Sequence, residues 1–426
     1  MNLKRIAINT TFLLFIAKSF GLILNLITLI IVAKLLGPSE YGIYTIAFTY
    51  FLLVDLIGNA GLGTFAQREL STRRRDKSDI IATSLAIAIL IGFILFIIGS
   101  IIGYFIYSKE NIDYSLLLVS SIIVITAILY GVPYHALVGL RLANKTMLSS
   151  IVKDTTVLIF SIILLKIGLG PYGALSALLI GYIFGSMIGI YYLIKKIGIG
   201  RVNKNVAKEA ISFSTPIAIN NAVSSSLSNI IVMVLGIYFS QYLVGNYGIM
   251  LRVFSIITLI YGTINLSMLT IYTYGIKRIA KLFERSFFIS LSTILIILFY
   301  IGANAKALIF FFIGSKYAIA PYFVLIGSIL LSFGIPSILI SPIFFSLKRQ
   351  KAILKINSIS YIISIFVFFV LLPIIGIYSG IVSFLFVYNI VNNFTYFKTI
   401  GIKVNKKKII RIYGIGFTFM LIFYIL

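Results

Sequence analysis

The sequence contains no cysteine and a single histidine, His135. Without thiols the chain forms no disulfide and offers no thiolate chemistry, and one histidine excludes a metal site built from several imidazoles. We therefore expect neither a metal ion nor a cofactor. A nucleotide-binding P-loop, GxxxxGK followed by Ser or Thr, is also missing, which excludes ATP hydrolysis within this chain as the source of energy.

Charged residues are scarce as well. They make up 11% of the 426 residues, whereas hydrophobic residues make up 60% and the mean hydropathy is +1.12. A soluble protein of this length needs far more polar surface. Because about 20 apolar residues cross the roughly 30 Å hydrocarbon layer as a helix, the sequence predicts an all-α polytopic membrane protein without a sizeable soluble domain.

The few charges are unequal in sign: 36 Lys and Arg against 10 Asp and Glu, a formal net charge of +26. We place 29 basic residues in the N-terminus and every second predicted loop, five in the opposite loops, and two, Lys18 and Arg252, within predicted helices. Cytoplasmic loops of membrane proteins carry such an excess. This placement argues against a nucleic-acid partner and predicts a protein of the cytoplasmic membrane with a cytoplasmic N-terminus.

Hydropathy and turn signals predict 12 to 14 transmembrane helices, with thirteen drawn here. Their ranges are 11–35, 41–67, 80–107, 114–141, 147–168, 173–196, 209–237, 242–275, 284–304, 318–347, 351–372, 377–397 and 407–426. The predicted domains are an N-terminal six-helix lobe, 1–197, a basic cytoplasmic linker, 198–208, a C-terminal six-helix lobe, 209–400, and a basic loop with an extra helix, 401–426.

The stretch 34–70 has the most informative pattern. Gly37, Pro38 and Ser39 predict a tight outer turn, because proline fixes its own φ and glycine supplies unusual backbone geometry. Tyr41 and Tyr44 then suit an aromatic belt at the headgroups. A second outer turn is predicted at 241–246.

The sequence LGPSEYGIY, from Leu36, followed by GNAGLGTFAQREL, from Gly58, resembles the second helix of polysaccharide and oligosaccharide flippases. These are the Wzx-like polysaccharide biosynthesis proteins of the MATE-like MOP exporter superfamily. The resemblance implies two lobes of six helices, alternating access, and a lipid-linked oligosaccharide as cargo.

An internal repeat agrees with two lobes. YGIYTIAF beginning at Tyr41 recurs as YGIMLRVF beginning at Tyr247, each after a predicted outer turn. Both copies run from outside to inside, which predicts a parallel repeat about the membrane normal. The substrate site is then expected between the lobes.

Polar residues share one face on each of three predicted helices. The faces carry Thr11, Lys18 and Asn25 on the first helix; Thr45, Thr49, Asp55, Asn59 and Gln67 on the second; and Asn220, Asn221, Ser224, Ser225 and Ser228 on the seventh. Small polar residues also serve helix packing in membranes, which is the favoured interpretation of the serines, with a place in the cavity as the alternative. The predicted substrate cavity comprises Lys18, Asn25, Asp55, Asn59, Asn220, Asn221, Ser224 and Arg252.

The ionisable members of this set have competing interpretations, because a charge inside a membrane is costly. Lys18 either lines the cavity or extends its ammonium group to the surface, and the same choice holds for Arg252. Asp55 is either a salt-bridge partner of Lys18, a carboxylate that couples H⁺ or Na⁺ to transport, or a packing residue. His135 is interpreted as a packing residue with proton sensing as the alternative, and the Lys153–Asp154 pair as interfacial.

These observations predict a flippase that moves a polyprenyl- or dolichyl-(pyro)phosphate-linked oligosaccharide across the membrane by alternating access. It would act as a monomer among membrane lipids, with H⁺ or Na⁺ as a candidate coupling ion. A MATE-type multidrug or cation antiporter is the main alternative. A membrane glycosyltransferase or ligase is disfavoured, because the outer turns offer only Glu40, Glu110 and Asp113 and no paired histidine; the chain is predicted not to be an enzyme.

Overall fold

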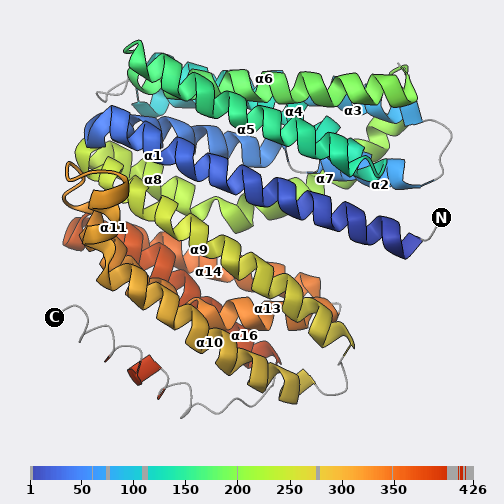
Figure 1. Cartoon of the computed structure of the whole chain (residues 1–426). Coiled ribbons are helices and arrows are strands. Elements are labelled where there is room, and N and C mark those ends of the chain that lie inside the picture. The colour runs from blue at the N-terminus through green and yellow to red at the C-terminus, as the bar shows by residue number, and fades with distance from the viewer. Residues whose placement is uncertain are drawn as a thin grey trace. The chain divides into compact units, whose positions relative to one another are not determined.

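The computed structural model describes residues 3–59, 61–72, 77–107, 114–198, 200–274, 279–347 and 349–400, together with 411, 413–415 and 418. The side chains of residues 3–19 are among those not described. All regular elements in the described residues are helices, which confirms the all-α class. Internal contacts divide the chain into unit 1, Met1–Ile237, and unit 2, Tyr238–Leu426, and each unit is described by itself (Figure 1).

Unit 1 contains eight helices in the described residues. They overlap the predicted ranges, but two of the predicted helices are each interrupted by a break. The eight helices are α1 (Leu3–Gly58), α2 (Leu62–Ser71), α3 (Lys77–Tyr107), α4 (Tyr114–Gly139), α5 (Ala143–Lys166), α6 (Gly170–Ile197), α7 (Lys204–Ser225) and α8 (Leu227–Tyr238), whose last residue lies in unit 2. Helix α7 contacts α1, α2 and α3, so unit 1 extends beyond the predicted linker. The boundaries 1–197, 198–208, 209–400 and 401–426 stay a prediction.

The element α1 joins two helices across the predicted turn. Gly37 has φ +71° and ψ 172°, and Pro38 follows it. No atom lies within 4 Å of a Cβ built on Gly37, so glycine is required for the backbone conformation and not for close packing. The aromatic belt predicted at this turn is wrong for Tyr41 and Tyr44, because both side chains are buried and their rings pack against each other at 5.7 Å.

The helix predicted at 41–67 breaks between α1 and α2. Gly61 has φ +104°, and a Cβ on it would lie 2.7 Å from the Cα of Ser214 in α7. Only glycine combines this φ with such a close approach of two backbones. The break separates Gln67, on α2, from the polar face on α1 with which the sequence grouped it.

The helix predicted at 209–237 also breaks, at Ser226 between α7 and α8. Pro216 lies inside α7, ten residues before this break, so the helix does not break at the proline. The hydroxyl of Ser226 donates to the carbonyl of Ala222. The predicted polar face from Asn220 to Ser228 therefore spans a helix interruption.

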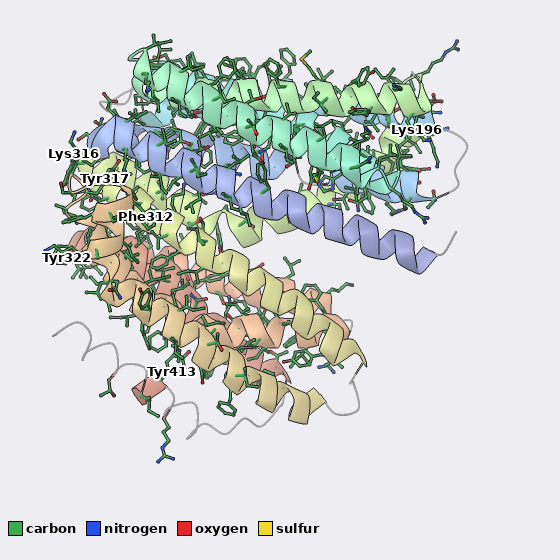
Figure 2. All side chains as sticks on the ribbon, in the orientation of Figure 1. Lys196, Phe312, Lys316, Tyr317, Tyr322 and Tyr413 are labelled. Carbon is green, nitrogen blue, oxygen red and sulfur yellow. The ribbon has the colours of Figure 1, made fainter. Side chains whose placement is uncertain are left out.

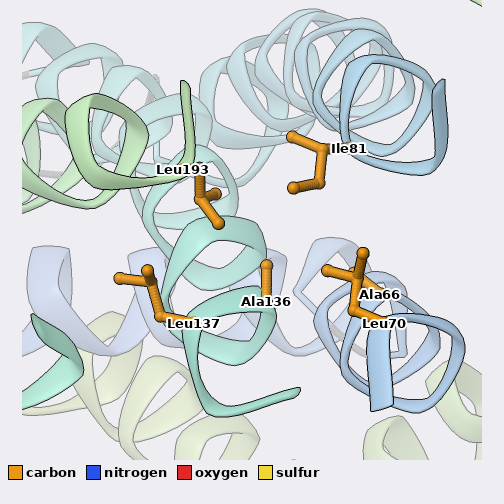
Figure 3. Close-up of a cluster of buried hydrophobic side chains, with 6 residues drawn as sticks. All are labelled: Ala66, Leu70, Ile81, Ala136, Leu137 and Leu193. Carbon is orange, nitrogen blue, oxygen red and sulfur yellow. The ribbon is translucent and has the colours of Figure 1, made fainter. Parts of the chain in front are cut away.

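Apolar packing fixes the end of unit 1 where α2, α3, α4 and α6 meet (Figure 3). The cluster consists of Ala66, Leu70, Ile81, Ala136, Leu137 and Leu193. Glycines of α6 at intervals of four allow similarly close packing along the bundle: a Cβ on Gly185 would lie 2.8 Å from the Tyr130 ring and one on Gly189 2.8 Å from Pro133. Small residues at such spacing let membrane helices approach closely.

Unit 2 contains the remaining helices of the described residues. They are α9 (Gln241–Tyr274), α10 (Ile279–Ala303), α11 (Ala305–Phe312), α12 (Ala320–Ser332), α13 (Ile335–Ser346), α14 (Gln350–Ile375), α15 (Tyr378–Ile381), the π-helical turn η2 (Val382–Val387) and α16 (Tyr388–Ile400). The outer turn predicted at 241–246 is wrong, since α9 begins at Gln241 and residues 239–240 form the turn. The helix predicted at 407–426 lies outside the described residues, apart from isolated positions.

Two breaks bend unit 2: α10 and α11 meet at 67°, and α12 and α13 at 43°. The second break precedes Pro336, which starts a helix readily but cannot continue one. Side chains satisfy the interrupted backbone there. Asn393 donates to the carbonyl of Phe333, and the Tyr413 hydroxyl donates to that of Ser332 at 2.8 Å, as an apolar environment requires.

By length and hydropathy, seven helices of the described residues can each cross a membrane, or nine if each bent pair is one crossing. This count treats α1 as a single span although it holds two helices. The chain is therefore a multi-pass membrane protein, and the predicted 12 to 14 helices are consistent with this arrangement.

Candidate functional site

The most concentrated group of charges in the described interior of unit 1 lies on α5. Lys153 Nζ and Asp154 Oδ1 are 2.6 Å apart, with the side chains 17% and 4% exposed. Because α5 begins at Ala143, ten residues before Lys153, the pair lies about 15 Å along the helix. The interpretation of these residues as interfacial is therefore wrong: the predicted helix began four residues too late, which moved both charges towards its end.

Asp154 also connects α5 with α1. The amide of Asn25 donates to Asp154 Oδ1 at 3.4 Å and to the carbonyl of Gly21 at 2.7 Å. A Cβ on Gly21 would lie 2.8 Å from Asp154 Oδ2, so the missing side chain lets α1 reach the carboxylate. The structure thus places the predicted cavity residue Asn25 beside an ion pair that the sequence did not assign to the site.

Two tyrosines enclose the ammonium group of Lys153. Its Nζ lies 5.3 Å from the ring centroid of Tyr182 and 5.6 Å from that of Tyr130, and the two rings are 5.7 Å apart. Aromatic faces attract cations most strongly where water is excluded. The positive charge of Lys153 is therefore compensated by a carboxylate and two ring faces.

Asp55 forms a second polar position in unit 1. Its carboxylate lies close to the side chain of Asn59 and within electrostatic reach of Tyr182. Asn59 in turn contacts α4 at Gly131, where a Cβ would collide with its amide. One carboxylate oxygen, Oδ1, is buried and meets no donor among the described residues. Tyr182 thus links the surroundings of Asp55 to the Lys153–Asp154 pair.

The salt bridge predicted between Asp55 and Lys18 stays a prediction, because the Lys18 side chain lies outside the described residues. The side chains of Asn220 and Ser224 also lie outside the described residues, so their place in the cavity stays a prediction. Asn221 is half-buried near the end of α7. In α1 the backbone is helical from Leu3, and Lys18 stands one turn before Gly21, the residue that contacts Asp154.

Arg252 belongs to unit 2 and is half-buried in α9. The sequence placed it about five residues from the outer turn. Because α9 begins at Gln241, Arg252 lies eleven residues into the helix, about 16 Å from its start. The choice between the cavity and the membrane surface for its guanidinium group stays a prediction.

His135 has a defined partner. Its Nδ1 lies 3.0 Å from Oε1 of Gln67, which connects α4 to α2. Gly63 of α2 faces the imidazole, since a Cβ there would lie 2.6 Å from the ring. This environment fits the packing interpretation of His135.

The sequence therefore found Asp55 and Asn59, which are half-buried in unit 1, and Asn25, which is exposed but contacts Asp154. It did not assign the Lys153–Asp154 pair or the two tyrosines beside it to the site. The sequence did contain a signal for the ion pair. Lys153 and Asp154 are the only charges between Lys145 and Lys166. Tyr130 and Tyr182 carried no such signal, because tyrosine is common throughout this chain.

Comparisons with known proteins agree with this arrangement. The family model described as polysaccharide biosynthesis protein matches residues 8–272, more than half of the chain. No curated protein matches the sequence.

Several solved membrane transporters have a similar fold. The lipid II flippase MurJ in an inward closed conformation aligns with a TM-score of 0.78 and 17% identity, over 97% of this chain and 92% of that one. An inward-facing multidrug resistance MATE family transporter of the MOP superfamily aligns with a TM-score of 0.74 and 14% identity, over 95% of both chains. A MOP superfamily transporter from Pyrococcus furiosus aligns at 0.60 and 15%, over 99% and 96%.

At these identities the solved structures establish the fold alone, which is the MATE-like fold that the sequence predicted. The family model shows that the chain is related to this family, because the match covers both the LGPSEYGIY stretch and the polar interior of unit 1. The chain belongs to the polysaccharide biosynthesis protein family.

Proposed function

We propose that this protein is a flippase that moves a polyprenyl- or dolichyl-(pyro)phosphate-linked oligosaccharide to the outer leaflet of the cytoplasmic membrane. The observation that carries the proposal is the family match over residues 8–272. The fold shared with a lipid II flippase supports it. The protein transports without catalysing a reaction on its cargo, acts as a monomer, and alternates access between the two sides with its N-terminus in the cytoplasm.

In this proposal the cargo's phosphate is recognised by cations of the membrane interior. Lys18 is the principal candidate, and Arg252 offers a bidentate fork that suits phosphate. Sugar hydroxyls are bound by amides and a hydroxyl, namely those of Asn25, Asn59, Asn220, Asn221 and Ser224. Lys153 is excluded from this role, because Asp154 at 2.6 Å already neutralises it.

The membrane potential can supply the energy. With the interior negative, an anionic headgroup moving outward gains about 2.3 kcal/mol per elementary charge per 100 mV. Asp55 need not then exchange a proton or Na⁺. Its buried Oδ1 without a described donor keeps ion coupling as the specific alternative, which the experiment below distinguishes.

The test measures flipping of a fluorescent lipid-linked oligosaccharide in proteoliposomes without ATP. We expect transport that an inside-negative potential accelerates, that Lys18→Ala abolishes and Lys18→Arg partly retains, and that Asp55→Asn retains better than Lys18→Ala. Lys34→Ala is the matched control, since it removes an exposed lysine from the same element α1.

Three results would each contradict a part of the proposal. Normal flipping by Lys18→Ala removes Lys18 from phosphate binding. Loss of flux in Asp55→Asn with intact cargo binding, together with wild-type flux driven by an H⁺ or Na⁺ gradient at zero potential, replaces potential-driven transport with ion coupling. Transport of drug cations instead of the glycolipid would establish the multidrug alternative.

Topology is tested separately in this cysteine-free chain. Ser39 is exposed beside the outer turn and Lys204 is exposed at the start of α7. We expect a membrane-impermeant thiol reagent to label Ser39→Cys from outside whole cells and Lys204→Cys only after the membrane is opened. The reverse pattern would invert the proposed orientation.

A further inference from the structure

The segment 304–322, which runs from the end of α10 into the first turn of α12, forms a bend that the proposed transport site does not use, and we call it the elbow. It contains α11, which leaves the direction of α10 by 67°. Figure 2 shows Phe312, Lys316, Tyr317 and Tyr322 gathered at this end of unit 2. A bend of this size turns α11 away from the direction of α10.

Residues at the start of α9 hydrogen-bond the elbow. Oδ1 of Asn246, a fully buried residue, accepts hydrogen bonds from the backbone N–H groups of Ile319 at 3.2 Å and Ala320 at 2.8 Å. These are donors that the first turn of α12 would otherwise leave unsatisfied. The Tyr242 hydroxyl adds a bond to the carbonyl of Lys316 at 3.4 Å, and Tyr317 is buried. These contacts hold residues 316–320 of the elbow against α9.

The other face of the elbow combines large aromatic side chains with lysines. Phe311 is 78% exposed, and Phe312 and Tyr322 are exposed as well. Lys306 and Lys316 are both exposed, and Nζ of Lys306 lies 5.9 Å from the Phe310 ring. Aromatic rings with lysines beside them are the composition of the membrane interface, where rings enter the acyl region and ammonium groups reach phosphate.

The charge pattern of unit 2 also favours a place for the elbow at the membrane interface. The start of α9 contacts the elbow, so both lie at one end of the unit, and the opposite end carries Arg349, Lys351, Lys355 and Lys398. By the positive-inside rule the elbow end is the outer one, where basic residues are rare. Yet of the five predicted outer lysines of the chain, Lys306 lies within this short helix and Lys316 lies four residues after it.

We propose that the elbow is an interfacial anchor that binds anionic phospholipid headgroups of the leaflet bordering this end of unit 2. The phenylalanines lie among the upper acyl chains, and Lys306 and Lys316 contact the phosphates. The occupant is bulk phospholipid, since a side chain as exposed as Phe311 needs cover at all times and a scarce glycolipid cannot provide it. The anchor fixes the depth of unit 2 independently of what the protein transports.

The first experiment measures depth in nanodiscs with the full chain. An NBD fluorophore is attached to Phe311→Cys, and quenching by lipids with a doxyl group at carbon 5 is compared with quenching at carbon 12. We expect stronger quenching from carbon 5. Phe366→Cys is the matched control, because Phe366 is 68% exposed near the middle of α14, and there the order should reverse. Equal depths at the two positions would overturn the anchor.

The second experiment measures lipid selectivity with the same Phe311→Cys reporter. Quenching by doxyl-phosphatidylglycerol is compared with quenching by doxyl-phosphatidylcholine. A lysine near an anionic surface contributes about fivefold in affinity, so we expect at least fivefold selectivity for phosphatidylglycerol that disappears in K306Q/K316Q. The control K34Q/K166Q removes two other exposed outer lysines and should retain the selectivity. Equal selectivity in K306Q/K316Q, or equal loss in the control, would overturn headgroup binding by the elbow.

Discussion

The polar interior of unit 1 is charged, whereas that of unit 2, among its described side chains, consists mainly of amides and hydroxyls. In unit 1 an ion pair lies mid-helix in α5 beside Tyr182, and Asp55 lies within electrostatic reach of the same tyrosine. In unit 2 the hydroxyl of Ser360 donates to Asn392 at 2.7 Å, and Asn393 completes a broken helix. Arg252 is the proposed exception.

The sequence makes this difference sharper. Nine of the ten acidic residues belong to unit 1, and Glu284 is the single acidic residue of unit 2. A carboxylate that binds H⁺ or Na⁺ during transport would thus come almost necessarily from unit 1. The neutral groups of unit 2 satisfy interrupted backbone, a role in which each hydrogen bond gains little but its absence leaves a buried polar group unsatisfied.

The largest test of this comparison removes the cation of the ion pair. We expect Lys153→Met to destabilise the protein by about 3 to 5 kcal/mol, because it leaves the buried Asp154 carboxylate without its partner. The double variant Lys153→Met/Asp154→Leu should recover most of this loss, since no charge then remains. Thermal unfolding of purified protein in detergent, followed by size-exclusion chromatography, gives both values; a double variant as unstable as the single one would refute ionic pairing as the cause.

A second test concerns the break between α1 and α2 in unit 1. Gly61→Ala should cost about 2 to 3 kcal/mol, because the new Cβ adds a collision with the Ser214 backbone to the strain of φ +104°. Gly37→Ala is the matched control at φ +71° with open space around it, and backbone strain alone should cost about 1 to 2 kcal/mol. The same thermal assay compares them, and equal losses would mean that the α2–α7 contact is not close-packed.

The smallest effect is expected in the neutral interior of unit 2. Ser360→Ala removes one hydrogen bond between α14 and α16 and should cost about 0.6 kcal/mol, the average for such bonds between membrane helices. A loss as large as that of Lys153→Met would abolish the contrast between the units. The double variant Ser360→Ala/Asn392→Leu separates the hydrogen bond from packing, and its loss should be no larger than the sum of the two single losses.

The sequence by itself determined the all-helical membrane class, the turn at Gly37 and the placement of most helices. These follow from local causes: about 20 apolar residues must cross the hydrocarbon layer, and glycine before proline stops a helix. The same local reasoning identified Asp55, because a carboxylate within an apolar run needs compensation wherever it lies.

Tertiary structure decided the breaks and the partners. Hydropathy does not show that Gly61 meets the backbone of Ser214, 153 residues later, so the predicted helix 41–67 ran through the break. Nor does it show that α1 brings Gly21 and Asn25 against Asp154. A buried ion pair depends on groups from several helices meeting in an apolar interior, and only the packing of those helices decides which groups meet.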